Sequence, residues 1–300
     1  MAGRRNGGHG YPYTAATVKF EKWQSLANDY LIIEADELPF ELGEARIRAL
    51  CAAHTGLDAD GIALLSGADD PGISARLRIF NPDGSEAEVS GNGAREAALY
   101  LHRHGWAQGE DFSIQTAAGI LQVTVTSPTS CSVALGQART SSADFPSGTN
   151  GGRGKLTAGG RTWAFQHVQV GNPQVAIRVR DEHELRGIDL PAVGPLIERH
   201  ELFPQRTNVS WFAPLTRDRI RVRIFERGVG ETAASGTGAT GAAVAHVLEG
   251  GTSPVTVLLD GGQLQVEVGE DLEIRLSGWA VPVFAGELAP EFEAELHGLA

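Results

Sequence analysis

The sequence predicts an α+β fold of two pseudo-symmetric domains, each a mostly antiparallel sheet wrapped around a central helix, with a ligand cleft between them. The main observation is a pattern that occurs twice. Arg76-Leu77-Arg78-Ile79-Phe80 is followed after nine residues by Ser90-Gly91-Asn92-Gly93-Ala94, and Arg221-Val222-Arg223-Ile224-Phe225 is followed after nine residues by Ser235-Gly236-Thr237-Gly238-Ala239. The copies are 145 residues apart in a chain of 300. This equal spacing indicates two equivalent halves, each bringing a small-residue turn to a matching place.

A helix is expected after each of the two turns. Residues 94–105 form a helical run that ends in glycine, and residues 239–249 form a second run that is closed by Gly250 and Gly251. The second run is rich in Ala and Val on all sides. Such a composition predicts a helix buried in the middle of its domain.

Strands are expected on both sides of each helix. Apolar and polar residues alternate in residues 121–126 and again in residues 264–268, which is typical of half-buried strands. Upstream, an asparagine precedes a short apolar run in residues 28–33 and in residues 172–177. The repeat therefore extends over most of each half, although it does not predict the order of the strands.

The repeat also divides the chain. We expect residues 1–17, which lack the apolar stretch of a secretory signal, to be a mobile N-terminal extension. Residues 18–140 would form the first half and residues 155–286 the second, with the last strand free to return to the first half. Residues 141–160 are rich in Ser, Gly and Thr and are expected to form a linker or long loop.

Composition favours an enzyme-sized cytoplasmic protein. The formal net charge of −12 argues against nucleic acid or an anionic membrane as the main partner, and no apolar run is long enough to cross a membrane. Cys51 and Cys131 are too few for a disulfide framework, which favours a reducing compartment, and Cys51 is expected to be a buried structural thiol. No metal is expected, because His and Cys show no ligand spacing, and neither turn has the ending of a phosphate loop.

The two turns are suited to binding an anion. A helix start leaves backbone N–H groups unpaired and carries the positive end of the helix dipole, and glycines let a ligand approach the backbone closely. Two such starts facing one cleft would hold a carboxylate. Ser90 and Ser235 could also be ordinary N-caps, but the matched spacing of the two copies favours the anion site.

These residues resemble the diaminopimelate epimerase family. Asn81-Pro82-Asp83-Gly84-Ser85-Glu86 with Gly91-Asn92-Gly93-Ala94-Arg95 is similar to one family signature, and Phe225-Glu226-Arg227-Gly228-Val229-Gly230-Glu231-Thr232 with Gly236-Thr237-Gly238-Ala239 is similar to the other. Further similar segments, in the family's order, contain Asn28, Gly171-Asn172-Pro173 and Asn208. The resemblance covers roughly residues 18–286.

The resemblance implies a cofactor-independent epimerase that interconverts LL- and meso-2,6-diaminopimelate in lysine and peptidoglycan-precursor biosynthesis. One residue would remove the α-proton and another would return a proton to the opposite face, commonly in a homodimer. The backbone N–H groups of Gly91, Asn92, Gly236 and Thr237 would hold the reacting carboxylate. The implied partners of the other end of the substrate are Asn28, Asn81, Asn172, Asn208 and Arg227 for the distal carboxylate and Glu226 for the distal ammonium group.

The chain departs from the family where the chemistry occurs. Ser90 and Ser235 occupy the positions of the family's two catalytic cysteines, and Gln174 stands where a histidine is usual. A thiol near a helix N-terminus ionises close to neutral pH, whereas a serine hydroxyl acts as a base only with an adjacent activating group. His54, His167 and His200 remain, and each is expected to be structural.

Four interpretations stay open at the sequence level. The chain is an epimerase that uses Ser90 and Ser235 or a relayed water, or it is a different isomerase with a carboxylate base such as Glu86 or Glu231, as in the phenazine-biosynthesis isomerase group. Alternatively it is a non-catalytic amino-acid binder that kept the carboxylate site. In the fourth interpretation both serines were engineered from cysteine to trap a ligand.

Overall fold

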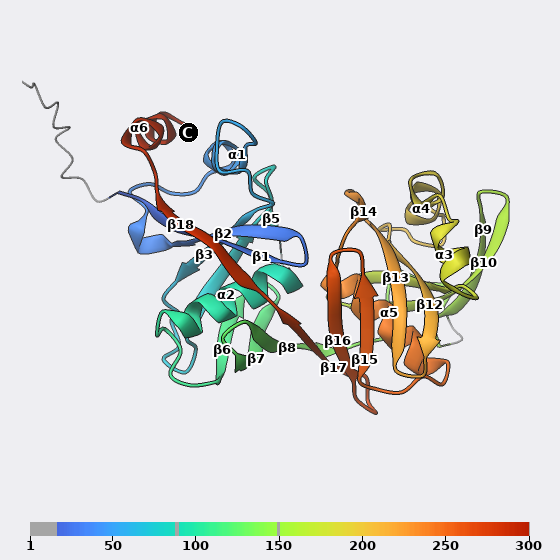
Figure 1. Ribbon diagram of the computed structural model, residues 1–300. Coiled ribbons are helices and arrows are strands. Elements are labelled where there is room, and N and C mark those ends of the chain that lie inside the picture. The colour runs from blue at the N-terminus through green and yellow to red at the C-terminus, as the bar shows by residue number, and fades with distance from the viewer. Residues whose placement is uncertain (1–16, 88–89, 149–150, 300) are drawn as a thin grey trace, which may run out of the picture.

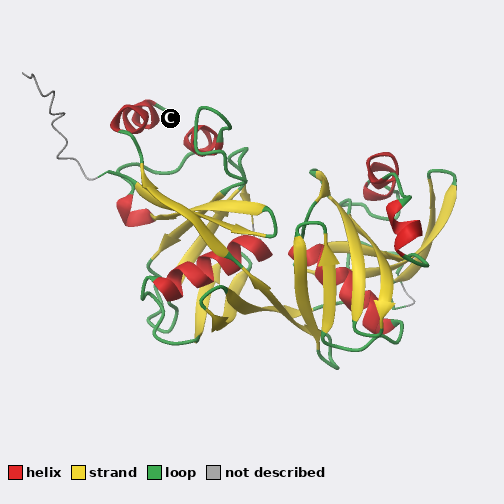
Figure 2. Cartoon of the chain, viewed as in Figure 1, coloured by secondary structure: helices red, strands yellow, loops and turns green. Residues whose placement is uncertain are grey.

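The computed structural model describes residues 17–87, 90–148 and 151–299, so most of the expected N-terminal extension, residues 1–17, lies outside the described residues. The chain forms two similar halves that lie side by side (Figure 1), and Figure 2 shows one long helix surrounded by strands in each of them. The α+β fold with two pseudo-symmetric halves is therefore confirmed.

Among the described residues, the first half contains eight strands in sequence and the last strand of the chain. They are β1 (Lys19–Ser25), β2 (Asn28–Glu34), β3 (Ile62–Ser66), β4 (Ala75–Phe80), β5 (Glu86–Ala87), β6 (Asp111–Thr116), β7 (Gly119–Ser127), β8 (Ser130–Gln137) and β18 (Val281–Glu287). Its helices are η1 (Ala35–Glu37), α1 (Glu44–Cys51), α2 (Gly91–Arg103) and α6 (Pro290–Gly298).

The second half contains the remaining strands. They are β9 (Arg153–Ala158), β10 (Arg161–Val170), β11 (Asn172–Arg178), β12 (Asn208–Thr216), β13 (Arg219–Glu226), β14 (Gly230–Thr232), β15 (Val255–Leu259), β16 (Gly262–Val268) and β17 (Glu273–Trp279). Its helices are α3 (Glu182–Arg186), α4 (Leu190–Glu198) and α5 (Gly236–Leu248).

The pairing of strands is the same in both halves. β2 pairs parallel with β3, β3 antiparallel with β4, β4 parallel with β6, and β6–β7–β8 continue antiparallel. The series β11, β12, β13, β15, β16, β17 repeats this pattern in the second half. β18 pairs with β1 as β9 pairs with β10, so the last strand lies in the first half. Antiparallel pairing of β8 with β17 joins the two halves.

Each long helix is the centre of its half. On α2, residues Asn92–Leu101 are buried, and on α5 burial runs without interruption from Gly238 to His246. The apolar core of the first half gathers around Ala94, Ala97 and Ala98, whose small side chains let the strands pack close to the helix. Because α5 has no polar face, it is buried all round, as its composition predicts.

The prediction that residues 141–160 form a linker or long loop is wrong at the C-terminal end of this range. Residues 153–158 form β9, and the predicted boundary at residue 155 falls inside this strand. Leu156 pairs with Trp163 of β10, and the apolar side chains of both residues are buried. The turn-forming glycines around this short strand dominate its composition and conceal the alternation of buried residues. None of the helices in the described residues is long and apolar enough to span a membrane.

Candidate active site

A cleft of about 640 Å³ lies between the halves, where the two central helices begin. It is lined by residues of both repeat copies, so the predicted position of the ligand cleft agrees with the structure. Ten of the twelve predicted site residues line it, namely Asn28, Asn81, Ser90, Gly91, Asn92, Asn172, Glu226, Ser235, Gly236 and Thr237. The other two, Asn208 and Arg227, are not among the lining residues.

The N-termini of α2 and α5 meet in this cleft. An added Cβ on Gly91 would lie 3.4 Å from the Cα of Gly236, and the reverse distance is also 3.4 Å. A Cβ at either position would thus be in van der Waals contact with the other glycine, so the two helix ends lie close together. Each helix end presents backbone N–H groups without intrahelical partners and the positive end of the helix dipole. The glycines thus place two sources of N–H donors close enough to act on one anion.

Ser90 is an N-cap residue, and its hydroxyl has a second partner. Its Oγ accepts a hydrogen bond from the backbone N–H of Gly93 at 3.1 Å and another from the hydroxyl of Tyr30 at 3.2 Å. Tyr30 lies on β2 and also lines the cleft. Burial raises the pKa of Tyr30, so its phenol is protonated at neutral pH. Tyr30 was not among the predicted site residues, although it directly follows Asn28-Asp29.

Ser235 has a different set of partners. Its Oγ accepts from the backbone N–H of Gly238 at 3.3 Å and donates to Oε2 of Glu226 at 2.9 Å. The other carboxylate oxygen, Oε1, accepts from the hydroxyl of Thr232 at 2.8 Å. Burial raises the pKa of Glu226, and the two hydroxyl donors partly offset this. A carboxylate therefore stands directly behind the serine at the start of α5.

Asparagines form the walls of the cleft. The amide of Asn92 donates to Oδ1 of Asn28 at 3.1 Å, and the amide of Asn28 donates to Asp60 at 2.9 Å. In the second half the amide of Gln174 donates to Oδ1 of Asn172 at 2.5 Å and to the hydroxyl of Thr237 at 3.1 Å.

These contacts orient the wall residues before any ligand binds. Gln174, which stands in place of the expected histidine, is fully buried, and its hydrogen bond to Thr237 links β11 to α5.

Asn208 and Arg227 lie next to the cleft in a supporting arrangement. Oδ1 of Asn208 accepts from the backbone N–H of Arg227 at 2.9 Å, and its amide donates to the carbonyl of Pro173 at 3.0 Å. The guanidinium of Arg227 donates to the carbonyl of Gln205 at 2.9 Å. Asn208 thus fixes the turn that follows β13, while the side chain of Arg227 is engaged away from the cleft lining.

The other candidate bases do not line the cleft. Arg78 donates to both carboxylate oxygens of Glu86, at 2.9 and 2.8 Å, and lowers the pKa of that carboxyl. Arg223 holds Glu231 through two nitrogens, at 3.0 and 2.6 Å. Neither glutamate is positioned as the base that the sequence suggested, because each is paired with an arginine of the strand that precedes its turn.

The three histidines singled out in the sequence, His54, His167 and His200, are also absent from the lining of the cleft. His167 is buried and its Nε2 lies 2.9 Å from the hydroxyl of Ser142. Cys51 is buried, as expected of a structural thiol. Within the described ranges, no group of three or more His, Cys, Asp or Glu side chains could hold a metal ion.

Comparison with known families gives one match over most of the chain. The family model described as diaminopimelate epimerase matches residues 20–141 and 166–280. The diaminopimelate epimerase of Magnetococcus marinus is 38% identical over 275 residues, which cover 90% of this chain and 96% of that protein. The diaminopimelate epimerase of Moorella thermoacetica is 37% identical, with 89% of this chain and 98% of that protein covered.

Solved structures share the fold at low sequence identity. A hydroxyproline epimerase from Agrobacterium vitis superposes with a TM-score of 0.65 at 14% identity, covering 93% of this chain and 95% of that one. A phenazine biosynthesis protein from Bacillus anthracis superposes with a TM-score of 0.64 at 16% identity, covering 91% and 99%. These likenesses show that the two-domain architecture is shared.

Proposed function

The chain belongs to the diaminopimelate epimerase family, and we propose that it is a cofactor-independent epimerase that interconverts LL- and meso-2,6-diaminopimelate. The observation that carries the proposal is the cleft in which two helix N-termini, each preceded by a serine, face each other. Inversion at a carbon atom needs one group to remove a proton and another to supply one from the opposite side. We propose that the serines at the two helix starts would form such a pair.

The reacting carboxylate would bind between the two helix starts. The backbone N–H groups of Gly91 and Asn92 on one side, and of Gly236 and Thr237 on the other, would donate to its oxygens. When the α-proton leaves, negative charge spreads onto this carboxylate. Donors that are already oriented stabilise the developing charge without reorganisation, which lowers the barrier to proton removal.

Proton removal would occur at the Ser235 side. Glu226 accepts the hydrogen bond of the Ser235 hydroxyl and can take its proton as that hydroxyl takes the α-proton of the substrate. The elevated pKa of Glu226 makes it a stronger base than an exposed carboxylate. We propose this role for Glu226 in place of the implied contact with the distal ammonium group, since its carboxylate accepts the hydroxyls of Ser235 and Thr232.

The distal end of the substrate would meet the asparagine walls. Asn28, Asn81 and Asn172 line the cleft and offer amide donors for a distal carboxylate. Arg227 would add a charged contact by turning its guanidinium from the carbonyl of Gln205, and Asn208 would act through the backbone of Arg227 that it holds. The buried free thiols Cys51 and Cys131 are in keeping with a reducing cytoplasm as the site of action.

A second candidate function is that of a non-catalytic amino-acid binder. The observation that favours it is the presence of serine at both proton-transfer positions, because a serine hydroxyl is a far weaker acid than a thiol. The carboxylate site would still bind the same ligands in such a protein. Binding alone therefore does not separate the two functions.

Cysteine at both serine positions is expected to accelerate the reaction. We expect the parent chain to exchange the α-hydrogen of LL- or meso-diaminopimelate with solvent deuterium, and the Ser90→Cys, Ser235→Cys double variant to do so at least about tenfold faster, because helix N-termini favour thiolates. Proton NMR in deuterium oxide measures both rates. Exchange by the double variant alone would identify the parent as a binder, and absence of binding by either protein would exclude both functions.

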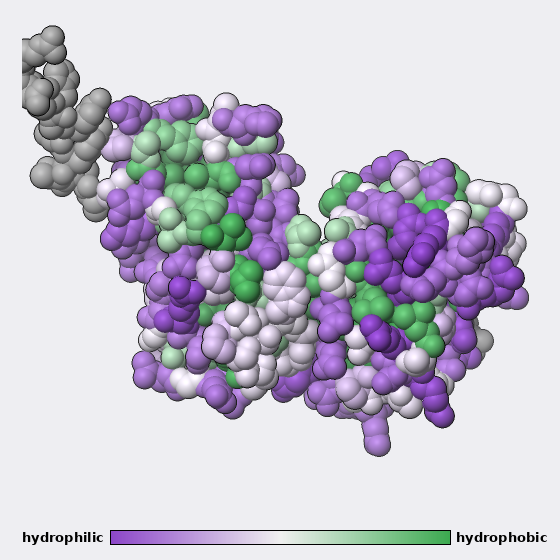
Figure 3. All heavy atoms as spheres, viewed as in Figure 1, coloured by the Kyte–Doolittle hydropathy of each residue, from purple (hydrophilic) through white to green (hydrophobic). Residues whose placement is uncertain are grey.

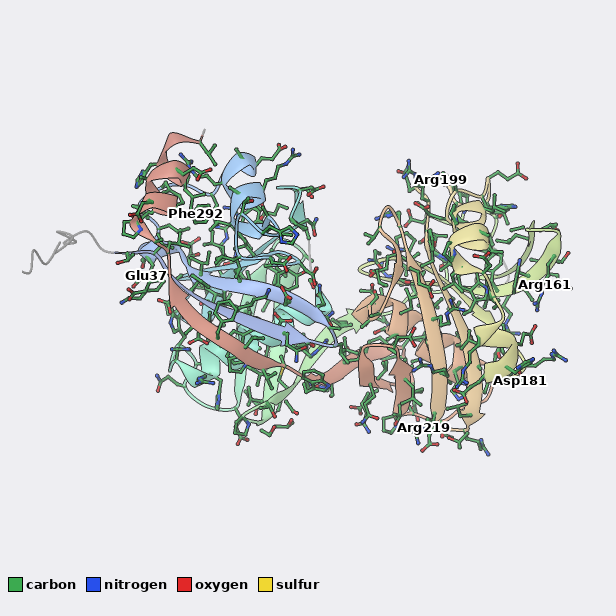
Figure 4. All side chains as sticks on the ribbon, turned by 45° about the horizontal axis from the view of Figure 1, so that its top comes forward. Glu37, Arg161, Asp181, Arg199, Arg219 and Phe292 are labelled. Carbon is green, nitrogen blue, oxygen red and sulfur yellow. The ribbon has the colours of Figure 1, made fainter. Side chains whose placement is uncertain are left out.

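The protein would act as a homodimer through the outer face of the first half. Val283 and Phe284, which are neighbours on β18, are 55% and 44% exposed, and contiguous exposed apolar side chains mark interaction surfaces. Figure 3 shows apolar side chains over β18 and the segment leading to α6, and Figure 4 places Phe292 on this side, remote from the second half. We expect Phe284→Glu to convert a dimer into a monomer in analytical ultracentrifugation. A monomeric parent chain would contradict this assembly.

A further inference from the structure

The two serines of the cleft differ in what their hydroxyls can offer a substrate. A serine hydroxyl has one donor hydrogen and two acceptor lone pairs. At Ser90 both lone pairs are used, by the backbone N–H of Gly93 and by the phenol of Tyr30. Within the part of the chain that the structure describes, its own hydrogen has no hydrogen-bond acceptor, so it is available to a ligand in the cleft that Ser90 lines.

The Ser235 hydroxyl has the opposite hydrogen-bonding arrangement, with its hydrogen engaged and one lone pair available. Its hydrogen is directed at Oε2 of Glu226, and one lone pair accepts from the backbone N–H of Gly238. The second lone pair remains for a substrate. The cleft therefore has a proton donor at one end and a proton acceptor at the other, although the two repeat copies have the same sequence pattern.

The residue that creates this difference is Tyr30. Its ring is enclosed by glycines on both sides, because a Cβ on Gly61 would lie 2.6 Å from the ring carbon Cε1 and a Cβ on Gly93 would lie 3.4 Å from Cε2. Only 6% of Tyr30 is exposed. The ring is thus held in one place, with its hydroxyl directed at Ser90.

We infer that Tyr30 is a positioning residue that makes Ser90 the proton donor of the cleft, so that the Ser90–Tyr30 pair supplies the proton and the Ser235–Glu226 pair removes it. This inference rests on the proposed epimerase function and assigns proton removal and proton return to different serines. The α-proton passes to Ser235 Oγ as the Ser235 proton passes to Glu226. The carbanion then takes the proton of Ser90 Oγ on its opposite face, while the Tyr30 phenol proton moves to Ser90. Solvent finally reprotonates the Tyr30 oxygen and takes the proton from Glu226.

Replacement of Tyr30 by phenylalanine is expected to uncouple proton removal from proton return. In Tyr30→Phe, kcat for inversion should fall by about 100-fold or more, with little change in KM. For the isomer whose α-hydrogen faces Ser235, deuterium exchange without inversion should rise at least about tenfold relative to inversion, because the base remains in place. Ser90→Ala, which removes the donor hydroxyl itself, should give the same signature. Polarimetry and proton NMR in deuterium oxide measure inversion and exchange.

Tyr100→Phe is the matched control. Tyr100 is also a buried tyrosine on the first half, and its hydroxyl donates to Glu34 at 2.8 Å, away from the cleft. This variant should keep the parent ratio of exchange to inversion. Equal loss of exchange and inversion in Tyr30→Phe, or an unchanged rate of inversion, would overturn the inference while the proposed function stands. A parent chain with neither inversion nor exchange would overturn both.

Discussion

Glu226→Gln should lose epimerisation almost completely. The glutamine side chain still fits between Ser235 and Thr232, but it cannot accept a proton from the Ser235 hydroxyl at neutral pH. General-base catalysis contributes about 10²- to 10⁴-fold to a rate, and we expect kcat for inversion and for α-hydrogen exchange to fall together by that factor. Steady-state kinetics with both isomers, together with exchange in deuterium oxide, measure the effect.

The control for this variant is Glu231→Gln. Glu231 lies on β14 near Glu226, but it is paired with Arg223 and does not line the cleft. Its replacement should change kcat by much less than tenfold, since the pair is partly exposed and contributes at most about 1 kcal/mol to folding. Equal losses in the two glutamine variants would show that Glu226 acts through the local structure and not as a base.

The pH dependence of the parent follows from the same carboxyl group. Since burial raises the pKa of Glu226, activity should rise with pH along a limb centred above the usual value of 4.5. A raised pKa also means that the folded chain binds this proton more tightly than the unfolded chain. The stabilisation from this group is present below the unfolded pKa and is lost as pH rises through the folded pKa. The free energy of unfolding of Glu226→Gln, measured relative to that of the parent chain, should therefore be higher at pH 7 than at pH 4. Chemical denaturation of both proteins at the two pH values measures this difference.

The fold class could be predicted because its signals are local in sequence. The turns after β4 and β13 each carry a Ser-Gly-x-Gly segment, and each is followed by an alanine-containing run that forms a central helix. Strand order could not be predicted in this way. The pairing of β8 with β17, and of β18 with β1, joins residues that are far apart in the chain, and no local pattern specifies them.

The meeting of the two helix starts could be predicted from the sequence, whereas the hydrogen-bond partners of the two serines could not. The glycines at the helix starts meet as the repeat suggested, because their position follows from the helices themselves. The partners of the two serines could not be inferred in the same way. Tyr30 reaches Ser90 across 60 residues of sequence, and Glu226 turns to Ser235 instead of toward the far end of the cleft. Both contacts depend on the tertiary packing of strands against a helix start.

A buried arginine joins the site to the connection between the halves. The guanidinium of Arg95 donates to the carbonyl of Gly91 at 2.8 Å, to Oδ1 of Asn92 at 2.5 Å and to the hydroxyl of Ser25 at 2.7 Å. Ser25 in turn donates to the carbonyl of Trp279 at 2.8 Å, at the end of β17. Arg95 is fully buried, which lowers its pKa, and it takes part in none of the ion pairs found among the described residues.

Arg95→Ala should therefore weaken folding and substrate binding at once. The variant leaves a cavity and several buried polar groups without their donor, and we expect the free energy of unfolding to fall by about 3 kcal/mol or more. Asn92 loses one of the two contacts that hold its side chain, so KM should rise as well. Urea unfolding and steady-state kinetics measure the two effects.

Arg103→Ala, at the exposed end of α2, should change stability by no more than about 0.5 kcal/mol. Equal stability of the two alanine variants would mean that the Arg95 guanidinium does not hold the helix start in place.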